Sequence, residues 1–228
     1  NIPNVLIESE LLSMPVRLGA SVLAALALGL ALAQRPWRGW LDDGERRAVW
    51  VASLLLLGAV WSLRAGFVPG SSLRFLLVTA FVLLHGWALA ILGAALVLVA
   101  LSSIGVADWA SLGPNLLCTA VVPALFAARL HEVVHRRLPR NYFVYFFVSV
   151  FLGSALAWLV AAAARALLLL ASGHPATGAE FGDDVLALLP LMSFGEAFIN
   201  GLLVSTAAVY RPRWVMSFDD ASYFSQRG

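Results

Sequence analysis

The chain has 228 residues, of which 61% are hydrophobic and 12% are charged, whereas soluble domains carry about 25% charged residues. This composition excludes a soluble globular protein and predicts one integral membrane domain, residues 1–228, in a lipid bilayer. The net charge is only +2, and no basic run with interleaved aromatic residues indicates nucleic-acid binding.

Seven apolar stretches are candidate membrane-spanning helices, because about 20 apolar residues are needed to cross a ~30 Å hydrocarbon core. In chain order they are 14–34, 48–63, 72–85, 87–104, 114–130, 141–171 and 185–210. The second and third are short, and we expect them in a thinned or protein-lined region. Pro123 and Pro190 interrupt the fifth and seventh stretches, where neighbouring groups must satisfy the freed carbonyls. The predicted fold class is all-α, a polytopic membrane bundle of seven transmembrane helices.

Arginine is concentrated on one side of this topology, and this distribution sets the predicted orientation. Segments 35–47 and 129–140 carry four arginines each, and the tail 211–228 carries three. By the positive-inside rule this side is cytoplasmic. The N-terminal segment 1–13 is therefore predicted to lie outside, and the C-terminal tail in the cytoplasm.

Two polar residues lie inside the last predicted span. Glu196 is the only acidic residue well inside any span, and a carboxyl group there indicates a functional role by default. Asn200 follows four residues later on the same helix face. Two interpretations are open: a ligand site, or hydrogen bonding between helices by a paired Glu and Asn.

Asn115, in the segment GPNLLC, begins the fifth predicted span. An asparagine at such a position is typical of a cap or a turn. We therefore expect Asn115 to cap or turn the chain there.

The motif His131-Glu132-Val133-Val134-His135 has the HExxH spacing that brings two imidazoles to one helix face in zinc proteases. However, Arg129, Arg136 and Arg137 surround it and oppose a bound cation. No third ligand segment is evident. A basic helix end is the favoured interpretation, and the chain is not predicted to be an enzyme.

The stretch from Pro69 to Ala90, PGSSLRFLLVTAFVLLHGWALA, combines a turn, an arginine and a tight hairpin. Arg74 falls near the predicted outer end of the third span and His85 at the inner end, so these two residues cannot form one site. The order of features predicts a site that faces the outer aqueous phase, with Arg74 at its mouth.

Four patches, spread over almost the whole chain, resemble the M-type permease family of cobalt and nickel energy-coupling-factor transporters. The opening Asn1-Ile2-Pro3-Asn4 is similar to the family's Met-His-Ile-Pro-Asp. PGSSLRFLL and HGWALAILGA resemble its Gly-Thr-Ser-Val-His-Leu-Leu turn and Gly-Pro-Trp-Ala hairpin. DWASLGPNLLCTAVVP resembles its Ala-Leu-Gly-Ala-Asn segment, and Glu196 to Gly201 followed by YRPRWV resembles its Glu-Ala-(apolar)-Thr-Gly span ending in Arg-Pro. The tail RPRWVMSFDDASYF is similar to a branch that lacks the usual metal-binding histidines.

This resemblance implies a seven-helix bundle that captures a divalent transition metal, such as cobalt or nickel, as its transported ligand. Family members use the N-terminal amine, a histidine at the second position and a histidine at the start of the third helix. The implied partners are other integral membrane subunits, among them a coupling protein with cytoplasmic ATPases, in the cytoplasmic (inner) membrane of a prokaryote. The ligand-binding positions carried over are Asn1, Asn4, Arg74, Asn115, Glu196 and Asn200, with Asn1 also the metal position.

The two family histidines fall on Asn1 and Arg74, and arginine is not deprotonated in proteins. At ~4 Å and an effective dielectric near 20, an arginine beside a divalent cation costs roughly 8 kcal/mol, about six decades of affinity. One hypothesis is therefore a substrate-capture subunit for a metal, an anionic ligand or a metal held by an anionic chelator. The alternative is an accessory subunit of a larger membrane complex that keeps the fold and has lost the metal site.

Overall fold

The computed structural model describes residues 7, 9–37, 42–62, 75–139, 141–173 and 183–217, with only the backbone described for 183–187. The long helical segments are α1 (Met14–Ala33), α2 (Gly44–Ser62), α3 (Val78–His85), α4 (Trp87–Ser103), Trp109–Arg137, Tyr142–Ala171 and α9 (Asp183–Tyr210). The segment Trp109–Arg137 contains η2 (Trp109–Ser111), α5 (Leu112–Leu116), the π-helical turn η3 (Leu117–Val121) and α6 (Val122–Arg137). The segment Tyr142–Ala171 contains α7 (Tyr142–Val144), the π-helical η4 (Tyr145–Leu152) and α8 (Gly153–Ala171). Short 3₁₀ turns η1 (Ser9–Leu11) and η5 (Pro212–Trp214) flank the bundle.

The all-α prediction is confirmed, since the described residues contain helices and no strand. Four of the described helices are long and apolar enough to cross a membrane: Met14–Ala33, Trp109–Arg137, Tyr142–Ala171 and Leu188–Tyr210. Trp87–Ser103 is a shorter apolar helix. The chain is therefore a multi-pass helical membrane protein.

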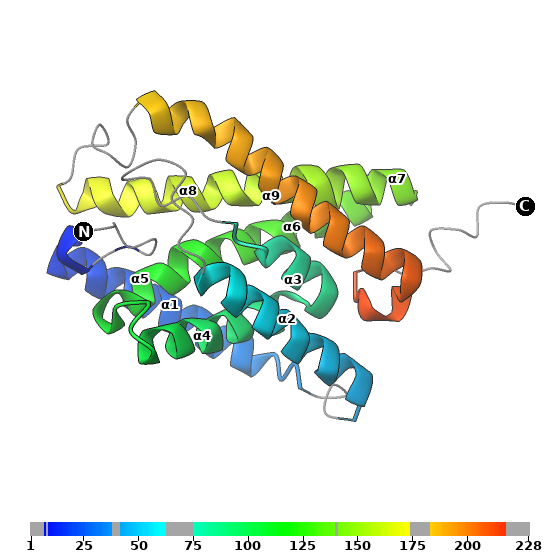
Figure 1. The fold of residues 1–228 in the computed structure, drawn as a ribbon, viewed down its shortest axis with the longest axis horizontal. Helices are drawn as coiled ribbons and strands as arrows, with labels where there is room; N and C mark the ends of the chain where they lie inside the picture. The colour runs from blue at the N-terminus through cyan, green and yellow to red at the C-terminus, as the bar shows by residue number, and fades with distance from the viewer. Residues whose placement is uncertain are drawn as a thin grey trace, which may run out of the picture.

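Helix α3 lies in the interior of the bundle, in contact with α4, α6, α8 and α9 (Figure 1). All residues from Val78 to Leu83 are buried. Around it, α8 packs against α6 and α9, and α1 packs against α4 and α5. The third predicted stretch thus lies in a protein-lined region.

The predicted span 72–85 was wrong in one respect: residues 75–77 are not helical and α3 begins only at Val78. Leu77, just before the helix, has a φ of 55°, a left-handed conformation that is uncommon outside glycine. The helix has 8 residues and so spans only about 12 Å at 1.5 Å per residue. It covers less than half of a ~30 Å hydrocarbon core.

A tight joint at Gly86 connects α3 to α4. Gly86 has a φ of +83°, and a Cβ added there would lie 2.6 Å from the Met216 methyl carbon. The backbone N–H groups of Met216 and Ser217 donate to the carbonyls of Leu84 and Leu83, at 3.2 and 3.1 Å. The segment after α9 therefore satisfies carbonyls at the end of α3 that have no partner within the helix.

The second irregular region is the π-helical turn η3, which ends at Val121, two residues before Pro123. A proline ring clashes with the carbonyl four residues earlier and removes a backbone donor. The wider turn makes room for the ring. In the same turn, the Thr119 hydroxyl donates to the Asn115 carbonyl four residues earlier at 2.7 Å, a bond that Thr commonly makes within a helix.

Candidate functional site

The candidate site begins where the chain enters α3. The Glu196 carboxyl group, on α9, accepts hydrogen bonds from two consecutive backbone N–H groups: Leu76 to Oε2 and Leu77 to Oε1, each at 2.7 Å. Glu196 is 1% exposed. The first N–H groups of a helix have no intrahelical partner, and the membrane interior offers no water to replace one. Glu196 therefore holds, from a different helix, the two N–H groups that directly precede α3.

Asn200 extends this contact by one turn. Its Oδ1 accepts from the backbone N–H of Ala80 at 2.7 Å. Its Nδ2 donates to the Glu196 backbone carbonyl and to Glu196 Oε1, both at 2.8 Å. The Asn200 amide thus satisfies a donor in the first turn of α3 and holds the Glu196 side chain in place.

Two more residues, which the sequence analysis did not identify, hold the same backbone. The Trp61 indole N–H, near the end of α2, donates to the Leu76 carbonyl at 3.3 Å. A Cβ added to Gly195 would lie 2.9 Å from the ring of Phe75, so only glycine lets that ring pack on α9. We call Gly195, Glu196 and Asn200 the α9 clamp. A glycine directly before an intramembrane glutamate was the only signal in the sequence that could have suggested this contact.

Asn115 fixes a second backbone segment, at Ile7. The prediction that it caps or turns the chain was wrong. It lies within α5, and its Oδ1 accepts from the Ile7 N–H at 2.8 Å while its Nδ2 donates to the Ile7 carbonyl at 3.2 Å. The same Nδ2 donates to the Ser111 hydroxyl at 3.0 Å. This pairing imitates one step of a β-ladder and requires an amide, because only Asn or Gln offers a donor and an acceptor together.

Ile7 itself is thereby held in the bundle. Ile7 is 2% exposed and packs with Leu12, Cys118 and Leu169. Nearby, Asp108 caps η2 by accepting from the Ala110 N–H at 3.0 Å. A hydrogen bond from the Ser9 side chain lowers the pKa of Asp108, and the Ala110 N–H adds to this effect. Ser9 is thus bonded to the loop before α5.

The structure brings Glu196 and Asn200 together at the start of α3, and it places Asn115 at the N-terminal segment. Asn1, Asn4 and Arg74 lie outside the described residues, although Phe75, the neighbour of Arg74, begins a described segment.

The HExxH motif is engaged in other contacts. Glu132 forms ion pairs with Arg129 at 3.7 Å and Arg136 at 2.7 Å. His131 Nδ1 lies 3.3 Å from the Ser149 hydroxyl. Over the described ranges, no three His, Cys, Asp or Glu residues are grouped so that they could hold a metal ion. The motif is a basic helix end.

Fold and site together define a multi-pass membrane protein in which buried side chains fix two backbone segments, one near the N-terminus and one at the entrance to a half-length helix. The chain belongs to the CbiM family, because the family model described as the cobalt uptake substrate-specific transmembrane region matches residues 7–214. This family provides the substrate-specific membrane component of cobalt and nickel uptake systems of the energy-coupling-factor type, and works in complexes with other transporter subunits. It is a family of transporter components. Comparisons with curated proteins and with solved structures gave no match.

Proposed function

We propose that this chain captures the substrate of a cobalt/nickel-type uptake system at an outward-facing site, formed where the N-terminal segment meets the entrance to α3. One observation carries the proposal. The α9 clamp fixes the backbone of Leu76, Leu77 and Ala80 directly after Arg74, the position of a family ligand. Such support is what a binding residue needs, because a site must be held within a fraction of an ångström of its productive geometry.

The same family places its other ligands at the N-terminus, and Asn115 fixes Ile7 there at 2.8 Å. In this proposal Asn1, Asn4 and Arg74 face the substrate. Glu196, Asn200 and Asn115 are positioning residues, because their polar atoms are occupied by the backbone of Leu76, Leu77, Ala80 and Ile7.

We further propose the membrane topology in which each of the seven helical segments crosses or enters the membrane within one domain, residues 1–228. Segment 1–13 is on the outer side and the tail 211–228 is cytoplasmic. The support is that the helical segments overlap all seven apolar stretches, together with the arginine distribution. The proposed partners are a coupling protein and its cytoplasmic ATPases, in the cytoplasmic membrane of a prokaryote.

The charge of Arg74 favours a metal that is held by an anionic chelator over the bare cation. A guanidinium forms bidentate hydrogen bonds with carboxylates, whereas it repels M²⁺ by roughly 8 kcal/mol at ~4 Å and a dielectric near 20. Asn1 also offers an amide where family members have imidazole, and imidazole suits Co²⁺ and Ni²⁺ better.

Equilibrium dialysis of the purified full chain tests this function, with Co²⁺ and Ni²⁺ each added bare and as the 1:1 citrate complex. We expect saturable binding of the complex, and citrate without metal should not bind. In the Arg74→His variant we expect bare Co²⁺ to bind at least about tenfold more tightly, because repulsion is replaced by a ligand. Asn141→Ala, which removes an exposed cap at the start of α7, is the matched control and should behave as the unmodified chain.

Absence of saturable binding in every form would contradict the capture function. The accessory-subunit alternative is favoured by the presence of Asn1 and Arg74 at both family histidine positions. Copurification separates the two: recovery with ATPase and coupling subunits supports uptake, whereas recovery with an unrelated integral complex supports the alternative.

A further inference from the structure

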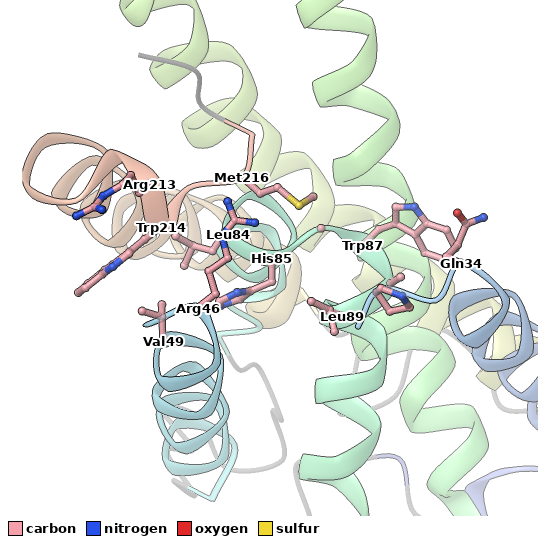
Figure 2. Close-up of a pocket in the computed structure, with 13 residues that line it drawn as sticks. Gln34, Arg46, Val49, Leu84, His85, Trp87, Leu89, Arg213, Trp214 and Met216 are labelled. Carbon is pink, nitrogen blue, oxygen red and sulfur yellow. The ribbon is translucent and has the colours of Figure 1, made fainter. Parts of the chain in front are cut away.

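Two adjoining hollows meet at the proposed cytoplasmic end of the bundle, where α3 ends and the segment after α9 begins. The first is a cavity of about 350 Å³. Figure 2 shows its lining: Arg46 from the start of α2, His85 at the end of α3, and Arg213 and Met216 from the segment after α9. Gln34, after α1, completes the polar part of the wall.

The second hollow is a groove of about 950 Å³ between α2 and α9, with one face of α3 as its floor. Its walls are mostly alanine and leucine, such as Ala52 on α2 and Ala207 on α9. Apart from Ser53 and Thr206, its polar residues gather at one end, where Glu45, Tyr210, Arg211 and Trp214 lie. The groove therefore has an apolar body and a polar mouth.

Three residues line both hollows: Val49, Leu84 and Trp214. The cavity and the polar mouth of the groove are thus neighbours, separated by little more than the Trp214 side chain. Trp and Tyr are enriched where membrane meets water, and Tyr210 is 77% exposed at this mouth.

The lining carries three arginines and one carboxylate. Glu45 already accepts a hydrogen bond from the Trp214 indole N–H at 2.7 Å. The Nε atom of Arg46 lies 3.4 Å from Asp43 Oδ2, and both side chains are about half exposed. Within the described part of the chain, Arg211 and Arg213 form no ion pair. The two hollows therefore present net positive charge beside an apolar groove.

We infer that these hollows bind an anionic phospholipid of the inner leaflet, with its phosphate beside Arg46 and Arg213 and one acyl chain along the groove. The inner leaflet carries the anionic lipids, and basic residues near it are attracted to them. The apolar body suits an acyl chain, and the arginines suit the phosphate. The arginines of this site are not those of the proposed capture site, although the groove reaches Leu77 and Ala80 at the α3 entrance, and the assignment to the inner leaflet rests on the proposed topology.

A transmembrane helix from a partner subunit fits the groove less well. A helix about 10 Å wide that rises 1.5 Å per residue fills roughly 120 Å³ per residue. A groove of about 950 Å³ would then enclose only about eight residues. A single acyl chain is thin enough to enter along its length.

Native mass spectrometry of the full chain in detergent tests the headgroup, with phosphatidylglycerol and phosphatidylcholine of identical acyl chains. We expect the chain to retain phosphatidylglycerol preferentially, and inorganic phosphate not to displace it. Arg46→Gln and Arg213→Gln should each reduce this preference about fivefold, from the usual attraction of one basic residue to an anionic leaflet. Arg137→Gln removes an exposed arginine from the end of α6, outside both hollows, and should change nothing.

The groove is tested separately by Ala52→Trp, which fills it, against Leu55→Trp on the same helix. Leu55 is 71% exposed and does not line the groove. We expect Ala52→Trp alone to lower retention. Equal retention of the two lipids, equal behaviour of Arg213→Gln and Arg137→Gln, or displacement by phosphate would overturn the inference. So would crosslinking of the Ala52→Cys variant to a partner subunit in lipid-saturated membranes.

Discussion

Glu196→Gln is the sharpest test of how α3 is held. The substitution keeps the size and shape of the side chain but replaces one acceptor oxygen by an NH₂ group. Oε2 faces the Leu76 N–H, whereas Oε1 faces both the Leu77 N–H and Asn200 Nδ2. Whichever way the new amide turns, a donor meets a donor. The least costly orientation places the nitrogen at the Oε2 position and gives up only the bond from Leu76.

The magnitude follows from the burial of this site. A buried donor left without a partner costs about 1–3 kcal/mol, and Glu196 is 1% exposed. A chain of this size loses about 2–4 °C of melting temperature per kcal/mol, so we expect a decrease of roughly 2–12 °C. Hydrogen exchange should accelerate at the amides of Leu76 to Ala80, by about 5- to 150-fold if the clamp alone protects them.

The assay is thermal unfolding in detergent combined with hydrogen-exchange mass spectrometry. Glu132→Gln is the control. The Glu132 side chain is 43% exposed, and the ion pairs of such surface groups contribute at most about 1 kcal/mol. Asn200→Asp alone should be as harmful as Glu196→Gln, since it opposes two carboxyl groups. Adding Glu196→Gln to Asn200→Asp removes the opposition of two carboxyl groups and should recover part of the loss caused by Asn200→Asp. The double variant should not be more stable than Glu196→Gln alone, because the amide nitrogen that faces the new carboxyl group at position 200 then also faces the Leu77 N–H. If Glu196→Gln melts and exchanges like the control, the clamp does not hold α3 and the reasoning is wrong.

Three further predictions concern the glycine of the clamp, the N-terminal segment and pH. Gly195→Ala places a methyl group 2.9 Å from an aromatic ring, whereas Gly201→Ala places one 3.5 Å from its nearest ring. Only Gly195→Ala should therefore lower the melting temperature. Equal melting temperatures of the two variants would contradict the close packing at Gly195. Asn115→Leu removes both bonds to Ile7 and should make the N-terminal segment more sensitive to protease in limited digestion, with an unchanged digestion pattern as the contrary result. The lowered pKa of Asp108 means that its contribution to stability is present above the unfolded pKa of about 3.9 and is lost as pH falls through the folded value. The melting temperature of Asp108→Asn should therefore fall less between pH 6 and pH 3 than that of the unmodified chain, and parallel curves would rule this out.

The sequence predicted the bounds of a helix well where an apolar run is continuous. It predicted them poorly where hydrogen bonds to distant residues determine where the helix begins. The stretch 87–104 became Trp87–Ser103 and 141–171 became Tyr142–Ala171, because an apolar run in a membrane must be helical to satisfy its backbone. The start of the third stretch was wrong because the partner of its N–H groups, Glu196, lies 120 residues away. No local pattern around Leu77 reports that bond.

The candidate site shows the same division. The cost of an acidic group inside the membrane singled out Glu196 in the sequence, and Asn200 was identified by its position on the same helix face. The structure shows both bonded to the backbone at the start of α3. Asn115 was identified as a residue of interest but was predicted to act locally, as a cap or a turn. Its actual partner, Ile7, is 108 residues away in the chain, and the residues next to Asn115 cannot reveal such a contact.

Helix α3 is attached to the last part of the chain at both of its ends. At its start, three backbone N–H groups bond to Glu196 and Asn200. At its end, the carbonyls of Leu83 and Leu84 accept from the segment after α9. Separating α3 from this part of the chain breaks five hydrogen bonds, each worth about 1 kcal/mol and more when a buried donor is left unpaired. We therefore expect α3 and the last part of the chain to move together. In the proposed function, the rearrangement that admits or releases substrate is then expected on the N-terminal side, where the described contacts are the two bonds of Asn115 to Ile7 and the bond of Ser9 to Asp108.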